Sequence, residues 1–115
     1  MDQGQLEHFR QKLLAARGAL VRELEAIPAV TDAGDVRDGD QADKSSAETD
    51  RDFSSINRER TRMLLAQADA ALVRIDNGTY GICEDTGRPI GLKRLEAQPT
   101  ATLSVEAQEQ RERAR

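Results

Sequence analysis

The sequence predicts a mainly α-helical protein built around a long antiparallel hairpin of two helices. Apolar residues recur at spacings of three and four in two long segments, and this period is typical of helices that pack along one stripe. Between these segments lies a stretch rich in Asp, Gly and Ser that contains almost nothing to bury. Aromatic residues make up 3% of the 115 residues and Trp is absent, which favours a narrow helix–helix seam over a wide globular core.

The first helical segment begins near Asp2 and ends before Pro28. Asp2 is a suitable N-cap, and Pro28 disfavours helical geometry in the residue that precedes it. The apolar stripe of this segment consists of Leu6, Phe9, Leu13, Ala16, Leu20, Leu24 and Ile27. Four of these residues are spaced seven apart, as in a coiled-coil seam. His8, the single histidine, lies off the seam, where we expect a solvated side chain rather than a metal ligand or catalyst.

An acidic segment follows the first helix. From Asp32 to Asp52 the chain has eight acidic and three basic residues, a local net charge of 3 − 8 = −5. We expect a loop, with helix resuming between Asp43 and Ser46. Two helices joined by a loop of about 15 to 20 residues most simply fold back as an antiparallel hairpin. The acidic segment, at about 32–46, is then the tip of the hairpin.

The second long helix is predicted from about Ala47 to Ile75, and Asn77-Gly78 is a typical helix stop. Glycines and a proline between Tyr80 and Leu92 indicate a short hairpin or knuckle. One helical turn is predicted over 92–97, and a polar final helix over 104–115, capped by Ser104 or Thr102. We therefore divide the chain into a coiled coil, 1–76, and a knuckle with a C-terminal helix, 77–115.

Composition excludes several classes of function. The net charge of −4 argues against general affinity for nucleic acid phosphate. A single cysteine excludes an internal disulfide and an all-cysteine zinc site within one chain. No apolar run approaches the roughly 20 residues that span a bilayer, and the polar start does not read as a signal peptide, so we expect a cytoplasmic protein. No nucleophile–base pair, phosphate-binding glycine loop or spaced ligand set indicates an enzyme.

One stretch, GTYGICEDTGRPIGLKRLEAQPTATL at Gly78–Leu103, has the layout of a small metal-binding knuckle. Together with the hairpin, its acidic tip and INRERTRML at Ile56–Leu64, it resembles the DksA/TraR family of bacterial transcription regulators, over about Leu13 to Arg111. The family has C-x-x-C before the glycine and a second C-x-x-C after TL. The corresponding ligand positions here hold Cys83, Thr86, Ser104 and Ala107. The resemblance therefore implies a degenerate finger, with no zinc or other cofactor expected.

The resemblance also implies a partner and a mechanism. Family members bind RNA polymerase rather than DNA, and their coiled coil enters the secondary channel through which nucleotides reach the catalytic centre. The acidic tip then lies near the catalytic magnesium and changes initiation at selected promoters. The family tip, D-x-x-D-x-A, corresponds to Asp40, Asp43 and Ser45, with Ser in place of Ala. An arginine at the position of Arg60 faces the polymerase rim, and Asn57 belongs to the same patch. We expect a monomer.

Plainer interpretations remain open for these residues. Asp43 could serve only as the N-cap of the second helix, and Arg60 only as part of an exposed face with Glu/Arg pairs. The whole chain could be a family member without regulatory activity, or an adaptor coiled coil. Family members that respond to guanosine tetraphosphate use basic residues where this chain has Gln67, Gln98 and Gln108. These glutamines lack the charge that pairs with phosphate, so we expect little dependence on that nucleotide.

Without zinc, apolar packing must hold the knuckle together. Structural zinc supplies several kcal/mol of folding free energy to small knuckles, and burial contributes about 1.5–3 kcal/mol per large apolar side chain. Cys83 is expected to be a buried small residue rather than a reactive thiol. The residues expected to fill the centre are Tyr80, Ile82, Ile90, Leu92, Leu95, Leu103 and Val105.

Overall fold

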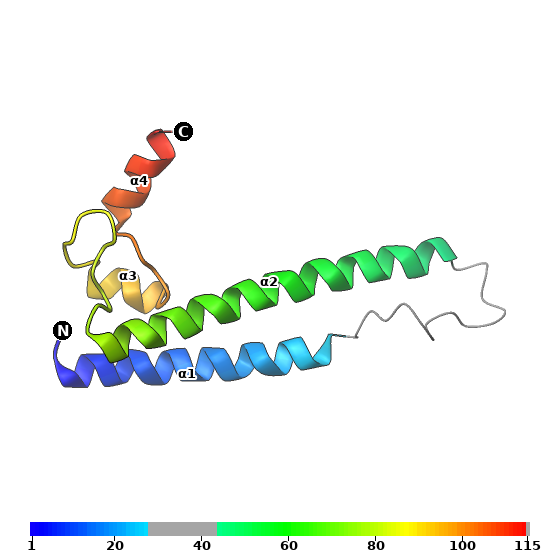
Figure 1. The fold of residues 1–115 in the computed structure, drawn as a ribbon, viewed down its shortest axis with the longest axis horizontal. Helices are drawn as coiled ribbons and strands as arrows, with labels where there is room; N and C mark the ends of the chain where they lie inside the picture. The colour runs from blue at the N-terminus through cyan, green and yellow to red at the C-terminus, as the bar shows by residue number, and fades with distance from the viewer. Residues whose placement is uncertain (28–43, 115) are drawn as a thin grey trace.

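The computed structural model describes the backbone of residues 1–27 and 44–114 and the side chains of residues 1–27 and 53–114. This part of the chain forms four helices, α1 (Gln3–Ala26), α2 (Lys44–Asn77), α3 (Leu92–Ala97) and α4 (Val105–Arg113). Helices α1 and α2 lie side by side and antiparallel, with α3 and α4 at the end where α1 begins (Figure 1). The predicted fold, a mainly α-helical hairpin with a small base, is confirmed. None of these helices is both long and apolar enough to cross a bilayer.

Helix α1 begins and ends where local signals predict. The Asp2 carboxylate accepts a hydrogen bond from the Gln5 N–H at 2.7 Å, and the Gln5 side chain accepts one from the Asp2 N–H at 3.0 Å. This reciprocal capping box satisfies backbone donors that the first turn cannot pair within the helix. At the other end Ile27 is extended, with φ −73° and ψ 126°, as expected for a residue before proline.

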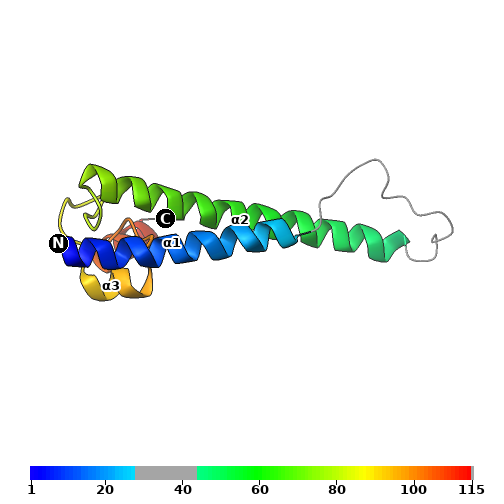
Figure 2. The same cartoon turned by 90° about the horizontal axis from the view of Figure 1, so that it is seen from below.

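Helix α2 is longer than α1, with 34 residues against 24. At 1.5 Å per residue the two helices are about 51 Å and 36 Å long. The helix starts at Lys44, within the predicted interval, and stops at Asn77. Gly78 follows with φ +82°, a left-handed conformation that glycine adopts at little cost. The Arg58 guanidinium donates to the Ile27 carbonyl at 3.3 Å, so the part of α2 before Arg58 extends past the end of α1 (Figure 2).

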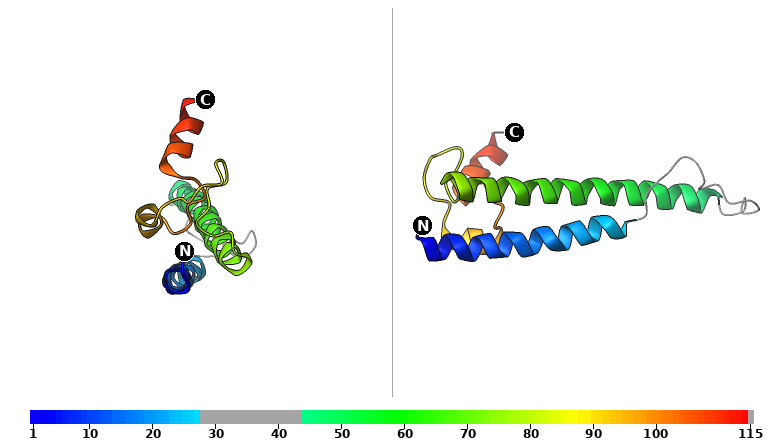
Figure 3. Two further views of the ribbon diagram at one scale, coloured as in Figure 1. Left: turned by 90° about the vertical axis from the view of Figure 1, so that its left-hand side faces the viewer. Right: turned by 60° about the horizontal axis from the view of Figure 1, so that its bottom comes forward.

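The buried core lies at the base of the hairpin and spans both halves of the chain. Phe9 and Leu13 from α1 pack with Ala71 and Ile75 from α2 and with buried residues of the region that follows: Tyr80, Cys83, Ile90, Leu95 and Ala107. Farther along α1, Leu20, Leu24 and Ile27 are only half-buried, and Ala16 is exposed. The seam is shallower there because α3 covers α1 only near its start (Figure 3). Burial is therefore concentrated where three elements meet.

Among the described side chains, two ion pairs join α1 to α2 outside this core. Arg17 Nε lies 2.5 Å from Asp69 Oδ1, and Arg10 Nη1 lies 3.0 Å from Asp76 Oδ1. All four side chains keep a third or more of their surface in solvent, where such pairs contribute about 0–1 kcal/mol. They help to set the register of the hairpin more than its stability.

Candidate functional site

The loop after α2 folds into a tight knuckle. Ile82 and Pro89 form an antiparallel bridge, and the Cys83 N–H donates to the Arg88 carbonyl at 2.8 Å. The Gly87 N–H donates back to the Cys83 carbonyl at 2.9 Å. Gly87 has φ +73°, which most side chains disfavour. This turn closes the segment from Cys83 to Gly87, which contains the first two ligand positions predicted by the family resemblance.

The start of α4 brings the other two predicted ligand positions to the knuckle. The Ser104 N–H donates to Cys83 Sγ at 3.4 Å, and Ser104 Oγ accepts from the Ala107 N–H at 3.2 Å. Ser104 is therefore the N-cap of α4, as predicted. Cys83, Ser104 and Ala107 are all buried. The arrangement of the four positions is compact, with hydrogen bonds between neighbours.

Cys83 is a buried hydrogen-bond acceptor, with 1% of its surface exposed. A hydrogen bond with the Thr86 side chain, followed by the one from the Ser104 N–H, lowers the pKa of Cys83 to about 6, although burial acts in the opposite direction. The packing prediction for this residue is confirmed. A thiol that is almost fully enclosed offers no route of attack to a reagent, whatever its thiolate fraction.

These four residues do not fit a zinc ion. A structural zinc site needs four sulfur, nitrogen or oxygen ligands in a closed tetrahedron. Ala107 offers only a methyl group, the Ser104 hydroxyl caps α4, and the Thr86 hydroxyl accepts from the Arg88 N–H at 3.2 Å. Cys83 is the one thiol in the chain. Among the described residues, no group of three or more His, Cys, Asp or Glu side chains could hold a metal ion either.

Apolar packing around the knuckle differs in part from the sequence prediction. Tyr80, Ile90 and Leu95 are buried and Leu103 is half-buried, as predicted. The prediction is wrong for three residues that are exposed: Ile82, Leu92 and Val105. Successive residues of the extended segment face opposite sides. Gly81 and Cys83 face the core, so Ile82 between them faces the solvent. Leu92 opens α3 and lines a surface groove, and Val105 opens α4 on its solvent side.

Tyr80 connects the core to the loop that follows α3. Its ring packs against Phe9, with the ring centroids 5.7 Å apart, and its hydroxyl donates to the Pro99 carbonyl at 2.7 Å. Burial raises the pKa of Tyr80 to about 12, against a smaller opposing effect of Arg74. The core-packing prediction for Tyr80 is confirmed, and its hydroxyl adds a hydrogen bond that the sequence did not indicate.

Glu96 on α3 joins the knuckle region to α1. Lys12 Nζ donates to the Glu96 carbonyl at 2.6 Å and to Oε2 at 2.7 Å, and His8 Nε2 lies 2.7 Å from Oε1. The Lys12 hydrogen bond, with a smaller effect of His8, lowers the pKa of the Glu96 carboxyl. His8 is exposed to solvent, as predicted, and its pairing with Glu96 is a contact that the sequence did not indicate. The two residues are 88 positions apart in sequence.

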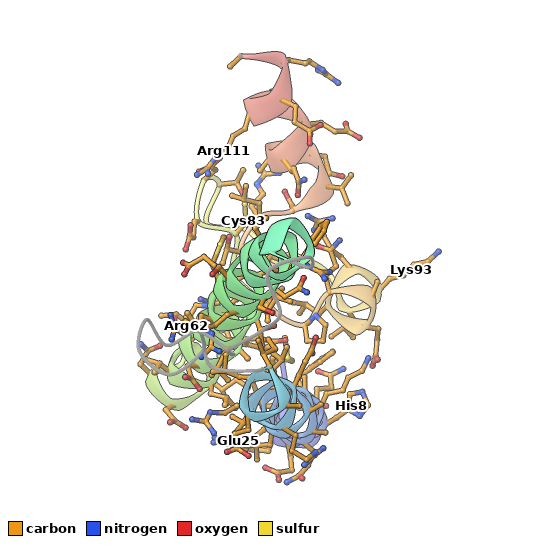
Figure 4. All side chains as sticks on the ribbon, turned by 90° about the vertical axis from the view of Figure 1, so that its right-hand side faces the viewer. His8, Glu25, Arg62, Cys83, Lys93 and Arg111 are labelled. Carbon is orange, nitrogen blue, oxygen red and sulfur yellow. The ribbon has the colours of Figure 1, made fainter. Side chains whose placement is uncertain are left out.

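Two arginines hold α4 against the rest of the base. Arg111, in the last turn of α4, donates to both carboxylate oxygens of Asp85, at 2.5 and 2.7 Å, and its side chain points toward the knuckle that contains Cys83 (Figure 4). This pairing lowers the pKa of Asp85 and raises that of Arg111. Arg94 on α3 donates to the Leu103 carbonyl at 2.7 Å and to Gln108 Oε1 at 2.5 Å. The sequence did not indicate either contact.

The residues predicted to contact polymerase lie along α2 and beyond it. Asn57 and Arg60 are exposed on α2. Arg60 lines a shallow groove on the outer flank of the helix. Asp40 and Asp43 lie outside the described residues, and for Ser45 the structure describes the helical backbone alone. The structure therefore leaves the tip residues as a sequence prediction.

The three glutamines predicted to replace basic residues occupy separate surroundings. Gln67 lines the groove on α2, Gln98 follows α3 as its C-cap, and Gln108 on α4 is hydrogen-bonded to Arg94. All three are exposed.

The geometry defines a class of protein: two long helices project from a base that keeps the layout of a zinc finger but has a thiol at one of the four ligand positions alone. Residues 5–75 match the sequence profile described as "DnaK suppressor protein DksA, N-terminal domain". Residues 78–113 match "Prokaryotic dksA/traR C4-type zinc finger". The chain belongs to the DksA/TraR family, as its motifs predicted.

Similar proteins span nearly the whole chain. The RNA polymerase-binding transcription factor DksA of Caulobacter vibrioides is 49% identical over 113 residues, covering 98% of this chain and 80% of the relative. DksA of Escherichia coli K12 is 32% identical, covering 92% and 70%. Among solved structures, the transcription factor DksA2 from Pseudomonas aeruginosa aligns with a TM-score of 0.78 and 38% identity, covering 99% of this chain and 88% of that one. The hairpin and its base are thus shared with a solved relative.

Proposed function

We propose that this chain is a transcription regulator that binds bacterial RNA polymerase through its helical hairpin and catalyses no reaction itself. The observation that carries the proposal is the α1–α2 hairpin, which projects from a base held by one buried core. The Caulobacter relative, which is 49% identical over most of both chains, is named for RNA polymerase binding. Initiation at selected promoters is the step that the regulator changes.

The hairpin is suited to reach into the secondary channel. A helix of 34 residues is about 51 Å long, and α1 supports it from the base to Arg58. The segment from Asp32 to Asp52 carries a net charge of −5, which attracts magnesium and basic side chains around a catalytic centre. Asp40 and Asp43 are the proposed acting carboxylates, with Ser45 beside them.

The base folds and supports the hairpin without zinc. One thiol, two engaged hydroxyls and a methyl group occupy the ligand positions, and packing and hydrogen bonds take over the structural role. A strong chelator should leave helicity and melting temperature unchanged. A clear fall in melting temperature on adding the chelator would overturn this part of the proposal.

The regulator acts with little dependence on guanosine tetraphosphate. Gln67, Gln98 and Gln108 bring no positive charge to pair with phosphate, and Gln108 is already bonded to Arg94. Strong synergy between the protein and the nucleotide in a promoter assay would contradict this expectation.

Binding and transcription assays test the function in two stages. Capture of purified RNA polymerase by the protein distinguishes a polymerase regulator from an adaptor coiled coil. Transcription with Asp43→Asn then tests the tip, against Asp35→Asn, which removes the same charge from the same acidic segment. We expect both variants to bind, and Asp43→Asn alone to lose the effect on initiation. Equal activity of the two variants would mean that Asp43 has no specific role at the catalytic centre.

A second candidate is a family member that binds polymerase without regulating it. Ser45 favours this alternative, because it adds a hydroxyl where the family has a methyl group. Wild-type protein that captures polymerase but leaves initiation unchanged would support it, and Ser45→Ala should then restore an effect.

A further inference from the structure

The side of α2 that faces α1 changes in character between the base and the tip. A line of buried or half-buried residues runs along this side at steps of four and three, the spacing of a coiled-coil seam. In order along the helix these residues are Ser54, Arg58, Thr61, Leu65, Ala68, Leu72 and Ile75. The four nearest the base are apolar, whereas the three nearest the tip are polar or charged. Arg58 therefore occupies a seam position that usually holds an apolar side chain.

Arg58 reaches from this position to the end of α1. Its guanidinium donates to the Ile27 carbonyl at 3.3 Å, and the side chain is half-buried. Ile27 is the C-cap of α1, where the last carbonyls have no partner within the helix. The last turn of α1 has no basic residue of its own. Arg58 therefore supplies, from the other helix, the positive charge that is favourable at a helix C-terminus.

Among the described residues, this contact is the polar link between α1 and α2 that lies nearest the tip. The two ion pairs between these helices lie nearer the base, the closer of them at Asp69. Asp69 is 69 − 58 = 11 residues from Arg58, or about 16 Å along the helix. Thr61 lies between them and is 3% exposed, but its hydroxyl donates to the Asn57 carbonyl of its own helix. The alignment of the outer hairpin thus depends strongly on Arg58.

A polar group in a helical seam specifies the register of the two helices more than it adds to their stability. Small and apolar side chains can pack in more than one alignment, whereas the Arg58 guanidinium meets the end of α1 in one alignment. A slip by one helical turn would move the end of α1 by about 5.4 Å along α2, which is more than the roughly 3 Å of a hydrogen bond. The chain enters the segment before the acidic tip directly after Ile27. The register at Arg58 therefore determines where that segment starts relative to α2.

We propose that Arg58 is a positioning residue for the acidic tip: it holds the C-terminal end of α1 against α2, so that the segment carrying Asp40 and Asp43 starts from a single register. The effect on initiation rests on the proposed function, whereas the effect on the hairpin does not involve polymerase. Arg58 acts on transcription through the alignment of the two helices.

The register is measured first, on the protein alone. Spin labels on Glu25→Cys and Ser55→Cys, both at exposed positions, report the distance between the end of α1 and the outer part of α2. The buried Cys83 should not react under native conditions, and protein without the added cysteines checks this. Double electron–electron resonance should give one narrow distance distribution in the otherwise wild-type protein, and a broader or two-peaked one when Arg58→Met is added.

Two further variants are the controls for the charge of Arg58. Arg58→Lys retains a positive donor at the seam position and should restore the narrow distribution. Arg22→Met removes the same charge from an exposed position of α1 and should leave the distribution narrow. A distribution for Arg58→Met that matches wild type would overturn the inference, while the proposed function would stand.

The melting temperature distinguishes a positioning role from a purely stabilising one. Replacing a charged group in a seam by an apolar side chain of similar length is often neutral or stabilising. Arg58→Met should therefore melt at the wild-type temperature or above it while its distance distribution broadens. A large fall in melting temperature with an unchanged distribution would mean that Arg58 only stabilises the hairpin.

Transcription with purified RNA polymerase then tests the link to the tip. Arg58→Met should bind as wild type does, but at saturating protein it should shorten the lifetime of open promoter complexes at least about tenfold less, because misplaced groups act poorly even when bound. Arg58→Lys should recover most of the effect. Parallel losses of binding and effect, or a full effect at saturation, would contradict the inference. If wild type itself leaves initiation unchanged, the proposed function and the role of Arg58 at the tip both fail, and the distance distributions still decide whether Arg58 sets the register.

Discussion

Replacing Leu95 by Ala should destabilise the whole base, because Leu95 fastens α3 to the core. Leu95 is 1% exposed and belongs to the same buried cluster as Phe9, Leu13 and Tyr80. Removing a fully buried leucine side chain to alanine costs about 2–5 kcal/mol. For a domain of this size each kcal/mol lowers the melting temperature by roughly 4–8 °C. We therefore expect a fall of at least about 8 °C.

The matched control is Leu92→Ala on the same short helix. Leu92 is 45% exposed, so the same chemical change should cost less than about 1 kcal/mol. Circular dichroism melts of both variants and of wild type, each with and without a strong chelator, measure the effect. Equal melting temperatures for the two variants would refute the packing account of the base. A chelator that lowers the wild-type melting temperature as far as Leu95→Ala does would refute it as well.

Three further predictions concern the contacts of the base. Lys12 and His8 lower the pKa of Glu96 in the folded protein. This carboxylate therefore stabilises the fold above pH about 4.5, and its contribution is lost as the pH falls through the lower pKa of the folded state. Glu96→Gln should flatten that part of an acid denaturation curve. Tyr80→Phe removes the hydrogen bond to the Pro99 carbonyl and should cost about 1–3 kcal/mol in urea denaturation, because the carbonyl is left unpaired. Because the pKa of Tyr80 is raised to about 12 in the folded protein, wild type should lose stability as the pH rises from 10 through 12. The Tyr80→Phe variant should not show this alkaline loss. Excess zinc followed by dialysis should leave no stoichiometric metal and the same melting temperature, since the ligand positions do not fit the ion.

Local signals were sufficient to predict most of the helix boundaries. Asp2, Ser104 and Gly78 act through their immediate neighbours, by capping or by a left-handed backbone, so a short window of sequence contains the whole cause. The arrangement of Cys83 with Ser104 followed from the family motif rather than from any periodicity.

Contacts between distant segments could not be predicted in the same way. Glu96 meets His8 and Lys12 across 84 to 88 residues of sequence, and Asp85 meets Arg111 across 26. A third of the chain is charged, so each carboxylate has many possible partners until the packing of α3 and α4 brings one of them near. Burial also depends more on position in the fold than on the heptad pattern. Phe9 and Leu13 are buried where α3 covers α1, whereas Leu20, farther along the same stripe, is only half-buried.

The most direct test of the account is the lifetime of open promoter complexes at a ribosomal promoter, measured with purified polymerase, no added nucleotide and a chelator that removes zinc but leaves sufficient magnesium. We expect wild-type protein and Asp35→Asn to shorten the lifetime equally, and Asp43→Asn to bind without shortening it. A wild-type protein that captures polymerase but leaves the lifetime unchanged, or that works only when zinc or guanosine tetraphosphate is supplied, would contradict the account.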